Sequence, residues 1–265
     1  MNATSVVSRS DADLSEKGFA RYRHEDILAG IDEHDTDGLF EQIRQFFTDL
    51  PADPYAAGCN RYRGYGRALV VPWERSLTWL PTILDPQLGP VTEYYQGDHN
   101  PEYRGERRRF FAIPAEVQEN PLLRDIILFD VDQTLWLEHL NNGPLHVGVH
   151  FVKLAVDTPD DEAVSSPNVL HQDGEPFTFA HLISRDNVVG GVNVIAPPRC
   201  AGLLPEEVTS DLVLAEFTLE NPLESYAVHD PKVSHYVSPV RRGNQRRRGE
   251  RGVLLVDVTP YVPRI

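Results

Sequence analysis

Apolar residues in the first part of the chain recur at the three- and four-residue spacing of a helix. The set consists of Leu39, Phe40, Ile43, Phe46, Phe47 and Leu50. Asp35 to Asp37 can cap the start of this segment, and Pro51 can end it. The pattern predicts an amphipathic helix that buries this apolar face.

A second helix is predicted to begin at Asn120, because this capping residue is followed by Pro121 in the first turn. We expect it to run to about Leu140. Between the two helices, residues 52–120 are rich in Tyr, Arg, Pro and Gly. For this stretch we expect irregular structure with short strands.

From about Leu145 onward the apolar residues recur at the two-residue spacing of strands, with Val147, Val149 and Phe151 on one face. Further strands are predicted over residues 177–183, 191–195, 212–219, 225–228, 233–237 and 253–258. Turn signals separate them at Arg185-Asp186-Asn187, Asn221-Pro222 and Asp230-Pro231. Many short strands at close spacing favour a sandwich or barrel, and we predict a double-stranded β-helix, or jelly roll.

The length of 265 residues allows one large domain or two modest ones. We expect a single domain over residues 1–265. Within it, residues 1–15 form a disordered lead-in, 16–140 a helical and irregular N-terminal part, and 141–265 the jelly-roll core. Residues 158–168 read as a mobile surface loop rather than a domain boundary.

Composition narrows the class of partner. The formal charge of −15 disfavours nucleic acid, since the only dense basic run is Arg241 to Arg251. Cys59 and Cys200 are too few for a disulfide framework or a cysteine-built zinc site. No apolar run approaches the roughly 20 residues that span a bilayer, and the first residues lack a secretory signal. We expect a cytoplasmic enzyme that acts on small molecules.

Two histidines and an aspartate are the candidate metal ligands. His171 and Asp173 are two residues apart, so on an extended segment both side chains point to the same side. His235 lies in a predicted strand and can complete the set if the sheet folds back on itself. Two imidazoles and one carboxylate can hold one face of an Fe(II) ion and leave its other positions open. His229 is a competing third ligand, although Asp230 beside it suggests a turn.

Arg251 opens an apolar strand after the last predicted ligand. A guanidinium at the mouth of a barrel can bind a carboxylate through two hydrogen bonds. The alternative is that Arg251 merely ends a solvated loop formed by the arginines that precede it.

The segment from His171 to Ala196, HQDGEPFTFAHLISRDNVVGGVNVIA, resembles the metal-and-pocket block of the bacterial 2-oxoglutarate/Fe(II) dioxygenases typified by L-isoleucine 4-hydroxylase. The later pieces NPLESYAV, HYVSPV and ERGVLLV match the distal-histidine and arginine blocks of that family in order and spacing. Weaker similarity reaches back through HVGVHFVKL, RYRGYGR and SEKGF, so the resemblance covers nearly the whole chain.

This resemblance implies a double-stranded β-helix flanked by N-terminal helices, with His171, Asp173 and His235 as iron ligands. It also implies that Arg251 holds the distal carboxylate of 2-oxoglutarate, with O2 as the second cosubstrate. The extra arginines between His235 and Arg251 leave the register open, and Arg248 is the alternative. The implied activity is hydroxylation of a free L-amino acid, aliphatic (Leu/Ile-like) or cyclic (pipecolate/proline-like), with release of succinate and CO2.

A free amino acid needs a cation for its carboxylate and acceptors for its ammonium group. Arg61, Arg63 and Tyr65 are the best candidates, although a solvated edge strand explains them equally well. Glu175 can meet the ammonium group or be a plain loop residue, and Asn193 can donate to 2-oxoglutarate or substrate. The two remaining strand histidines, His150 and His181, more often serve as hydrogen-bonded core residues.

Two other functions remain open at this point. Asp130 and Asp132 lie in a stretch that looks like the DxDxT nucleophile loop of haloacid-dehalogenase-type phosphatases. That chemistry needs an apolar strand ending at Asp130, a later lysine and an acidic pair, and the helix predicted from Asn120 argues against it. The other function is a non-catalytic jelly-roll protein that binds a metal, for which Arg251 would have no use.

Overall fold

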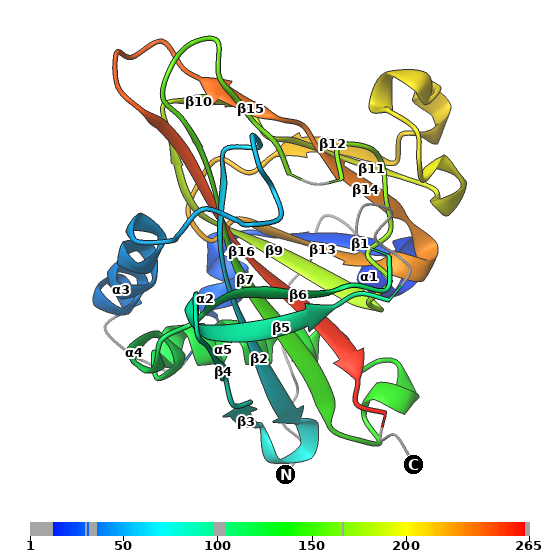
Figure 1. Ribbon diagram of the computed structural model, residues 1–265. Coiled ribbons are helices and arrows are strands. Elements are labelled where there is room, and N and C mark those ends of the chain that lie inside the picture. The colour runs from blue at the N-terminus through cyan, green and yellow to red at the C-terminus, as the bar shows by residue number, and fades with distance from the viewer. Residues whose placement is uncertain (1–12, 30, 32–35, 98–103, 166, 263–265) are drawn as a thin grey trace.

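The computed structural model describes residues 13–29, 31, 36–97, 104–165 and 167–262, and these form mainly β-structure (Figure 1). Of the lead-in predicted to be disordered over residues 1–15, residues 1–12 lie outside the described residues. The prediction is wrong for residues 13–15, because the Asp13 carboxylate caps helix α1 (Leu14–Lys17). No helix among the described residues is long and apolar enough to cross a membrane.

Ten strands form one large sheet that runs through the molecule (Figure 1). Their order is β1 (Phe19–Tyr22), β13 (Ser225–His229), β9 (Phe177–Asp186), β16 (Gly249–Pro260), β7 (Leu145–Val156), β2 (Arg61–Val71), β6 (Arg107–Ala112), β5 (Gly89–Tyr95) and β4 (Ile83–Asp85), with β3 (Ser76–Trp79) paired to β2. All neighbours pair antiparallel except β2 and β6, which are parallel.

Two small sheets of three strands each lie over one end of the large sheet. One contains β10 (Val188–Gly190), β15 (Val240–Arg242) and β8 (Glu162–Ala163). The other contains β12 (Ala215–Thr218), β11 (Val192–Ala196) and β14 (Ser234–Val237). The chain passes repeatedly between the large sheet and the small ones, so residues distant in sequence meet between them. This is the predicted double-stranded β-helix.

Helices cover the other face of the large sheet. They are α2 (His24–Leu28), α3 (Thr36–Thr48), α4 (Ala115–Gln118) and α5 (Pro121–Asp132), and short 3-10 turns occur at Pro72–Glu74, Glu138–Leu140, Pro198–Cys200, Pro205–Glu207, Ser210–Leu212 and Asp230–Lys232. The main core lies between α3, α5 and the sheet. There Phe151 packs against Phe46 and Phe47 of α3, with ring centroids 4.9 and 5.2 Å apart.

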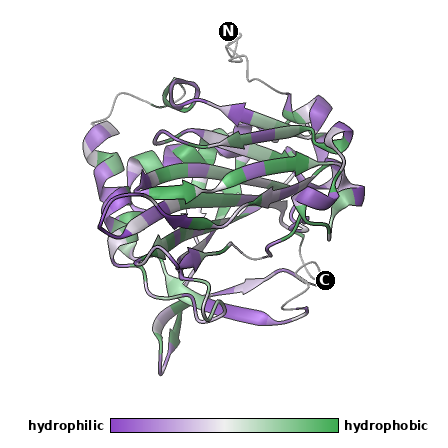
Figure 2. Ribbon diagram, turned by 90° about the horizontal axis from the view of Figure 1, so that it is seen from above, coloured by the Kyte–Doolittle hydropathy of each residue, from purple (hydrophilic) through white to green (hydrophobic). Residues whose placement is uncertain are grey.

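Polar residues are concentrated on the face of the sheet that the helices do not cover. Hydrophobic residues follow the central strands and the helices, whereas hydrophilic residues predominate on the outer turns (Figure 2). A smaller apolar cluster, with Leu182, Ile195 and Val253, joins the large sheet to the β11 sheet. Next to this cluster lies a cavity with many charged and polar side chains, among them most of the predicted site residues.

The prediction of short strands within residues 52–120 is wrong for β2, which spans eleven residues and pairs with β7 over most of its length. The face toward the cavities carries Arg61, Arg63 and Tyr65 and looks polar. The face toward the helices carries small residues between Tyr62 and Val70: a Cβ on Gly66 would lie 2.7 Å from Ile113 Cδ1 and 2.8 Å from Trp79 Cζ3. The usual apolar-polar alternation is therefore absent from this central strand.

The predicted helix over residues 39–50 is confirmed as α3, although the Asp35 part of its cap lies outside the described residues. Helix α5 starts at the predicted cap, where the Asn120 side chain accepts a hydrogen bond from the Leu123 N–H. It ends well before Leu140, because the Thr134 hydroxyl bonds the Val131 carbonyl and the chain turns there.

The predicted strands over the C-terminal half are present, with one partial error. Residues 212–219 form a strand only from Ala215, because a 3-10 turn occupies Ser210–Leu212. Strands β9 and β16 are longer than predicted, and β16 begins at Gly249, before Arg251.

Candidate metal centre

The two candidate histidine ligands are held side by side by the backbone. His171, in the segment before β9, exchanges two N–H···O hydrogen bonds of 2.9 Å with His235 on β14. Their ring centroids lie 4.3 Å apart. This pairing explains how two residues more than sixty positions apart in the chain reach the same point.

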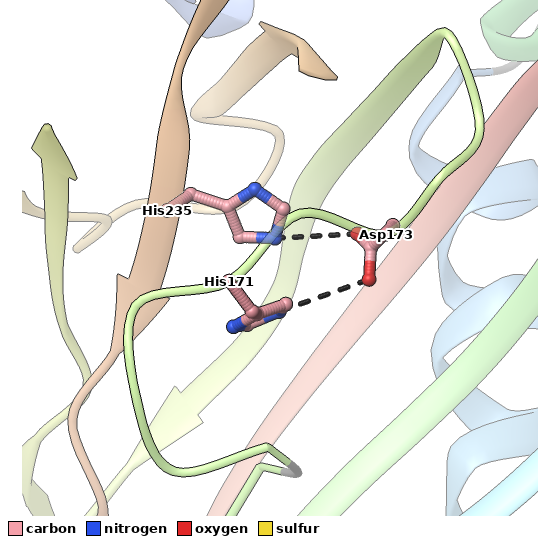
Figure 3. A group of neighbouring side chains, drawn as sticks. All are labelled: His171, Asp173 and His235. Atoms are coloured by element: carbon pink, nitrogen blue, oxygen red, sulfur yellow. Dashed lines mark ion pairs between the residues drawn. The ribbon is translucent and has the colours of Figure 1, made fainter. Parts of the chain in front are cut away.

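Asp173 completes the cluster, as the sequence spacing predicted (Figure 3). Its carboxylate oxygens lie 3.7 Å from His171 Nε2 and 3.2 Å from His235 Nε2. One ligand atom from each of the three residues lies within 4.8 Å of the others. Two imidazole nitrogens and one carboxylate oxygen at this separation fit a single Fe(II) ion with open coordination positions.

The protonation state of His171 also suits a metal ligand. The Nδ1–H of His171 donates to the Val169 carbonyl at 2.8 Å, which leaves Nε2 free as the ligand atom. Burial and the neighbouring His235 lower the pKa of His171 to about 4, so this imidazole is neutral at neutral pH. Burial opposes ionisation of Asp173, but the two histidines keep its pKa below the ordinary value.

Asp230 holds the turn that carries the ligands, a role that its place in an Asp-Pro turn did not indicate. Its two carboxylate oxygens accept the N–H groups of Asp173 and Gly174, each at 2.9 Å. The Gln172 side chain donates to the backbone carbonyl of Asp230. The backbone of Asp173 is therefore fixed from a second, distant segment.

The alternative third ligand, His229, does not belong to the cluster. Its ring stacks on Phe177, with centroids 4.6 Å apart, and meets the edge of Trp136. The strand alternation directs it away from the metal ligands and into an aromatic group.

Arg251 lines the same cavity as the three ligands. It is buried on β16, and burial lowers its pKa to about 10. Gly191 leaves room for it, since a Cβ there would lie 3.1 Å from Arg251 Nε. The alternative, Arg248, does not line this cavity: it lies at the surface, where it donates to the Tyr62 hydroxyl and approaches Glu250.

Asn193 is buried on β11 and also lines the cavity. One N–H of its amide donates to the Phe217 carbonyl at 3.3 Å. Its side-chain oxygen has no hydrogen-bond partner among the described residues. The amide therefore retains hydrogen-bonding capacity next to Arg251 and Tyr226.

A second group of cations lines the same cavity from β2, which lies two strands away from Arg251 in the large sheet. Arg61 is neutralised by Asp53 at 2.8 Å, whereas Arg63 lies over the Phe110 ring at 4.2 Å and bonds a histidine. Burial and the neighbouring Arg61 lower the pKa of Arg63 to about 10. Arg108, on β6, joins this group, and no pattern in the sequence indicated it. The structure thus brings Arg61 and Arg63 to the metal site and excludes the solvated edge strand.

Tyr65 and Glu175 line an adjoining cavity instead. Tyr65 is buried and stacks on His150, with centroids 4.3 Å apart. One oxygen of Glu175 accepts the Tyr94 hydroxyl at 3.0 Å, and the other has no partner among the described residues. Burial and the carboxylate of Asp257 raise the pKa of Glu175 well above its ordinary value. Tyr94 and Asp257 line both cavities and separate them.

The phosphatase hypothesis is wrong. The stretch with Asp130 and Asp132 forms helix α5 and its end, not a strand followed by a nucleophile loop. Asp130 is fully buried against His181, at 2.8 Å, and Asp132 pairs with Arg75 at the surface, at 2.5 Å. His181 has the predicted role of a hydrogen-bonded core histidine.

A jelly roll with two imidazoles and one carboxylate around a common point, beside a buried arginine, defines the class of non-haem iron oxygenases. The chain belongs to the 2OG-Fe dioxygenase family, whose model matches residues 44–257. It is therefore an oxidoreductase that uses Fe(II), 2-oxoglutarate and O2.

Two curated relatives are similar over most of their length. L-isoleucine-4-hydroxylase from Bacillus thuringiensis is 29% identical over 231 residues, 86% of this chain and 85% of the relative. The 3(1)-hydroxy-L-isoleucine 4-dioxygenase from Pantoea ananatis is 27% identical over 254 residues, 92% of each chain.

Solved structures share the fold. The crystal structure of IDO from Bacillus thuringiensis superposes with a TM-score of 0.71 and 24% identity, covering 94% of this chain and 93% of that one. That of a bsmA homologue from Methylobium petroleophilum gives a TM-score of 0.73 and 19% identity, covering 93% and 90%.

Proposed function

We propose that this dioxygenase hydroxylates an unactivated C–H bond of a free L-amino acid, aliphatic (Leu/Ile-like) or cyclic (pipecolate/proline-like). The observation that carries the proposal is one cavity with three candidate metal ligands and two groups of cations from different strands, Arg251 on β16 and Arg63 with Arg108 on β2 and β6. Two cationic groups suit two carboxylates, one from 2-oxoglutarate and one from an amino acid. The activities named for the two curated relatives add support.

In this proposal His171, Asp173 and His235 hold Fe(II), and Arg251 binds the distal carboxylate of 2-oxoglutarate. Asn193 donates its second amide N–H to the same cosubstrate. The bound iron, with 2-oxoglutarate and O2, supplies the oxidation that converts a C–H bond to C–OH and releases succinate and CO2. The protein contributes the aim of the substrate and the exclusion of water from the cavity.

The substrate carboxylate is assigned to Arg63, with Arg108 beside it. Arg61 has its own carboxylate partner in Asp53, which leaves Arg63 and Arg108 as the cations for the substrate. Glu175, the sequence candidate for the substrate ammonium group, lines the adjoining cavity beyond Tyr94 and Asp257, so no contact with the substrate is assigned to it. Tyr65 supports the site by packing rather than by touching the substrate.

A screen of succinate release tests the proposal. The full chain is supplied with Fe(II), 2-oxoglutarate and ascorbate, and with one free amino acid at a time, proteinogenic and non-proteinogenic. We expect release above the background of 2-oxoglutarate alone for a small set of aliphatic or cyclic L-amino acids, together with a hydroxylated product detected by mass spectrometry. Asp173→Ala is expected to abolish both signals.

Absence of stimulation by any amino acid would contradict the proposed substrate class. Full activity of Asp173→Ala would contradict the assignment of the metal ligands.

We also infer that residues 1–265 act as one catalytic unit, because a single family match extends over most of the chain.

A further inference from the structure

A chain of hydrogen bonds crosses four adjacent strands beneath the cavity. Arg63 Nη2 on β2 lies 2.6 Å from His150 Nδ1 on β7, and His150 Nε2 lies 2.7 Å from Asp257 Oδ2 on β16. The Thr178 hydroxyl on β9 lies 3.0 Å from Asp257 Oδ1 and 3.4 Å from Asp173 Oδ2. The chain thus begins at the proposed substrate cation and ends at a metal ligand.

The polarity of this chain follows from the donors. A guanidinium has only N–H groups, so His150 Nδ1 must be the acceptor in its contact with Arg63. A neutral imidazole then carries its proton on Nε2, which donates to Asp257. Burial and the charge of Arg63 lower the pKa of His150 to about 4, in agreement with a neutral ring.

The imidazole is also fixed in position. Tyr65 stacks on one face at 4.3 Å with an interplanar angle of 23°, and Tyr94 meets the ring edge-on at 4.9 Å. His150 and Asp257 are both buried. Because packing sets the orientation of the ring, only its tautomer can vary, that is, which of the two nitrogens carries the proton.

We propose that Asp257 is a positioning residue: by accepting the Nε2–H of His150 it fixes the tautomer that aims Arg63 at the substrate carboxylate. The Thr178 hydroxyl, whose single proton bonds Asp257 at 3.0 Å, lies 3.4 Å from Asp173, so Asp257 is one side chain away from the candidate metal ligands. The inference rests on the proposed function, since it assumes that Arg63 binds the substrate. It assigns to Asp257, which carried no signal in the sequence, control over substrate affinity.

The physical reason is that the opposite tautomer is incompatible with Arg63. A proton on Nδ1 would place two donors face to face at 2.6 Å, and the guanidinium would have to move away. The Asp257 carboxylate excludes this state because it can only accept hydrogen bonds. An amide at this position can donate instead, so Asp257→Asn permits the wrong tautomer while keeping the size of the side chain.

The direct test measures by NMR which ring nitrogen of His150 carries the proton, in the full chain labelled with 15N-histidine. The signals of His150 are assigned by their loss in His150→Gln. We expect a protonated Nε2 and an unprotonated Nδ1 in the wild type, and a shift of protonation toward Nδ1 in Asp257→Asn. In turnover, Asp257→Asn should raise KM for the amino acid about tenfold, with KM for 2-oxoglutarate changed less than about twofold. Asp186→Asn, which alters an exposed carboxylate on β9, is the matched control.

A second pair of variants, at His150, tests the donor and acceptor order of this hydrogen-bond chain without changing Asp257. Glutamine has one acceptor and one donor group, so His150→Gln can accept from Arg63 and donate to Asp257. His150→Leu can do neither. We expect His150→Gln to keep KM for the amino acid within about threefold of wild type and His150→Leu to raise it at least about tenfold.

Each outcome decides the inference. An unchanged tautomer in Asp257→Asn, an unchanged KM for the amino acid, or equal impairment in His150→Gln and His150→Leu would overturn the role of Asp257. By contrast, a wild type that responds to no amino acid contradicts the proposed function itself, and the NMR result then shows separately whether Asp257 controls the tautomer.

Discussion

At the scale of single residues, two arginines close together in sequence have different surroundings. Arg251 is buried in the metal cavity, whereas Arg248 lies at the surface next to Tyr62 and Glu250. The sequence left these two open as the ligand of 2-oxoglutarate, because the arginine-rich loop before them hides the register of β16. The buried place of Arg251 in the cavity is why we propose it rather than Arg248.

Arg251→Ala is therefore expected to raise KM for 2-oxoglutarate at least about tenfold, since truncating one partner of a buried charged pair costs about 2–5 kcal/mol. Arg248→Ala, the matched surface variant, should leave this constant within about twofold. Initial rates of succinate release over a range of 2-oxoglutarate concentrations give both values. A larger effect from Arg248→Ala would reverse the assignment.

The same scale shows what could be predicted of the site. The clustering of His171, Asp173 and His235 could be predicted because an i, i+2 pair on an extended segment and a later strand histidine are a pattern. Arg108 and Asp257 could not, because their partners, Gln96 and His150, lie on other segments of the chain. Only the pairing of the strands brings such residues together.

Asp230 gives a prediction of this kind, because it accepts the two N–H groups of the ligand turn. Asp230→Ala should weaken metal binding about 10- to 100-fold, the range typical of groups that orient a ligand. Anaerobic titration with Fe(II) or Co(II) measures the affinity. Asp160→Ala, in an exposed loop, should bind like the wild type. Equal affinity of Asp230→Ala and Asp160→Ala would show that the turn holds its shape without this carboxylate.

At the scale of elements, the predictions succeeded where the periodicity of apolar residues reports burial. Helix α3 and strands β7 and β9 have such periodicity and were predicted. The length and central position of β2 were not predicted, because its polar residues face an internal cavity and glycine and alanine take up three of its core-facing positions. Because polar residues of β2 line the cavity, the apolar pattern of this strand does not indicate that it lies in the centre of the sheet.

Close packing behind β2 leads to a prediction about Gly66. A methyl group there would meet Ile113 and the rigid Trp79 ring at less than 3 Å, so Gly66→Ala should cost about 1–3 kcal/mol of unfolding free energy. Gly143→Ala, where a methyl group meets nothing within 4 Å, is the control and should be close to neutral. Urea unfolding measures both. Equal stability of the two variants would mean that Ile113 and the Trp79 ring of β3 can move away from β2.

At the scale of the whole molecule, the large sheet separates two environments. One face packs against helices and is apolar, and the other encloses the charged cavity. The buried pair of Asp130 on α5 and His181 on β9 is an exception, since it places a carboxylic acid between the helical layer and the sheet. The side chain of His181 also contacts the Ser225 hydroxyl at 2.7 Å, so the polar group extends to β13.

This buried acid makes the stability of the whole fold depend on pH. Burial raises the pKa of Asp130 from 3.8 to about 6, so the folded state holds this proton more tightly than the unfolded state. The stabilisation from the protonated Asp130 is therefore complete below the pKa of Asp130 in the unfolded chain and is lost as pH rises through its folded pKa of about 6. Because one pKa unit corresponds to about 1.4 kcal/mol, the loss approaches about 3 kcal/mol.

Asp130→Asn removes this dependence and leaves the rest of the chain unchanged. We expect the unfolding free energy of the wild type, minus that of Asp130→Asn, to fall as pH rises from 4 to 7. Taking the difference cancels the many other carboxylates of this acidic chain. Asp132→Asn, at the exposed end of the same helix, should give a nearly constant difference. A difference for Asp130→Asn that stays constant or increases with pH would mean that pairing with His181 outweighs burial and keeps this carboxylate ionised in the folded protein.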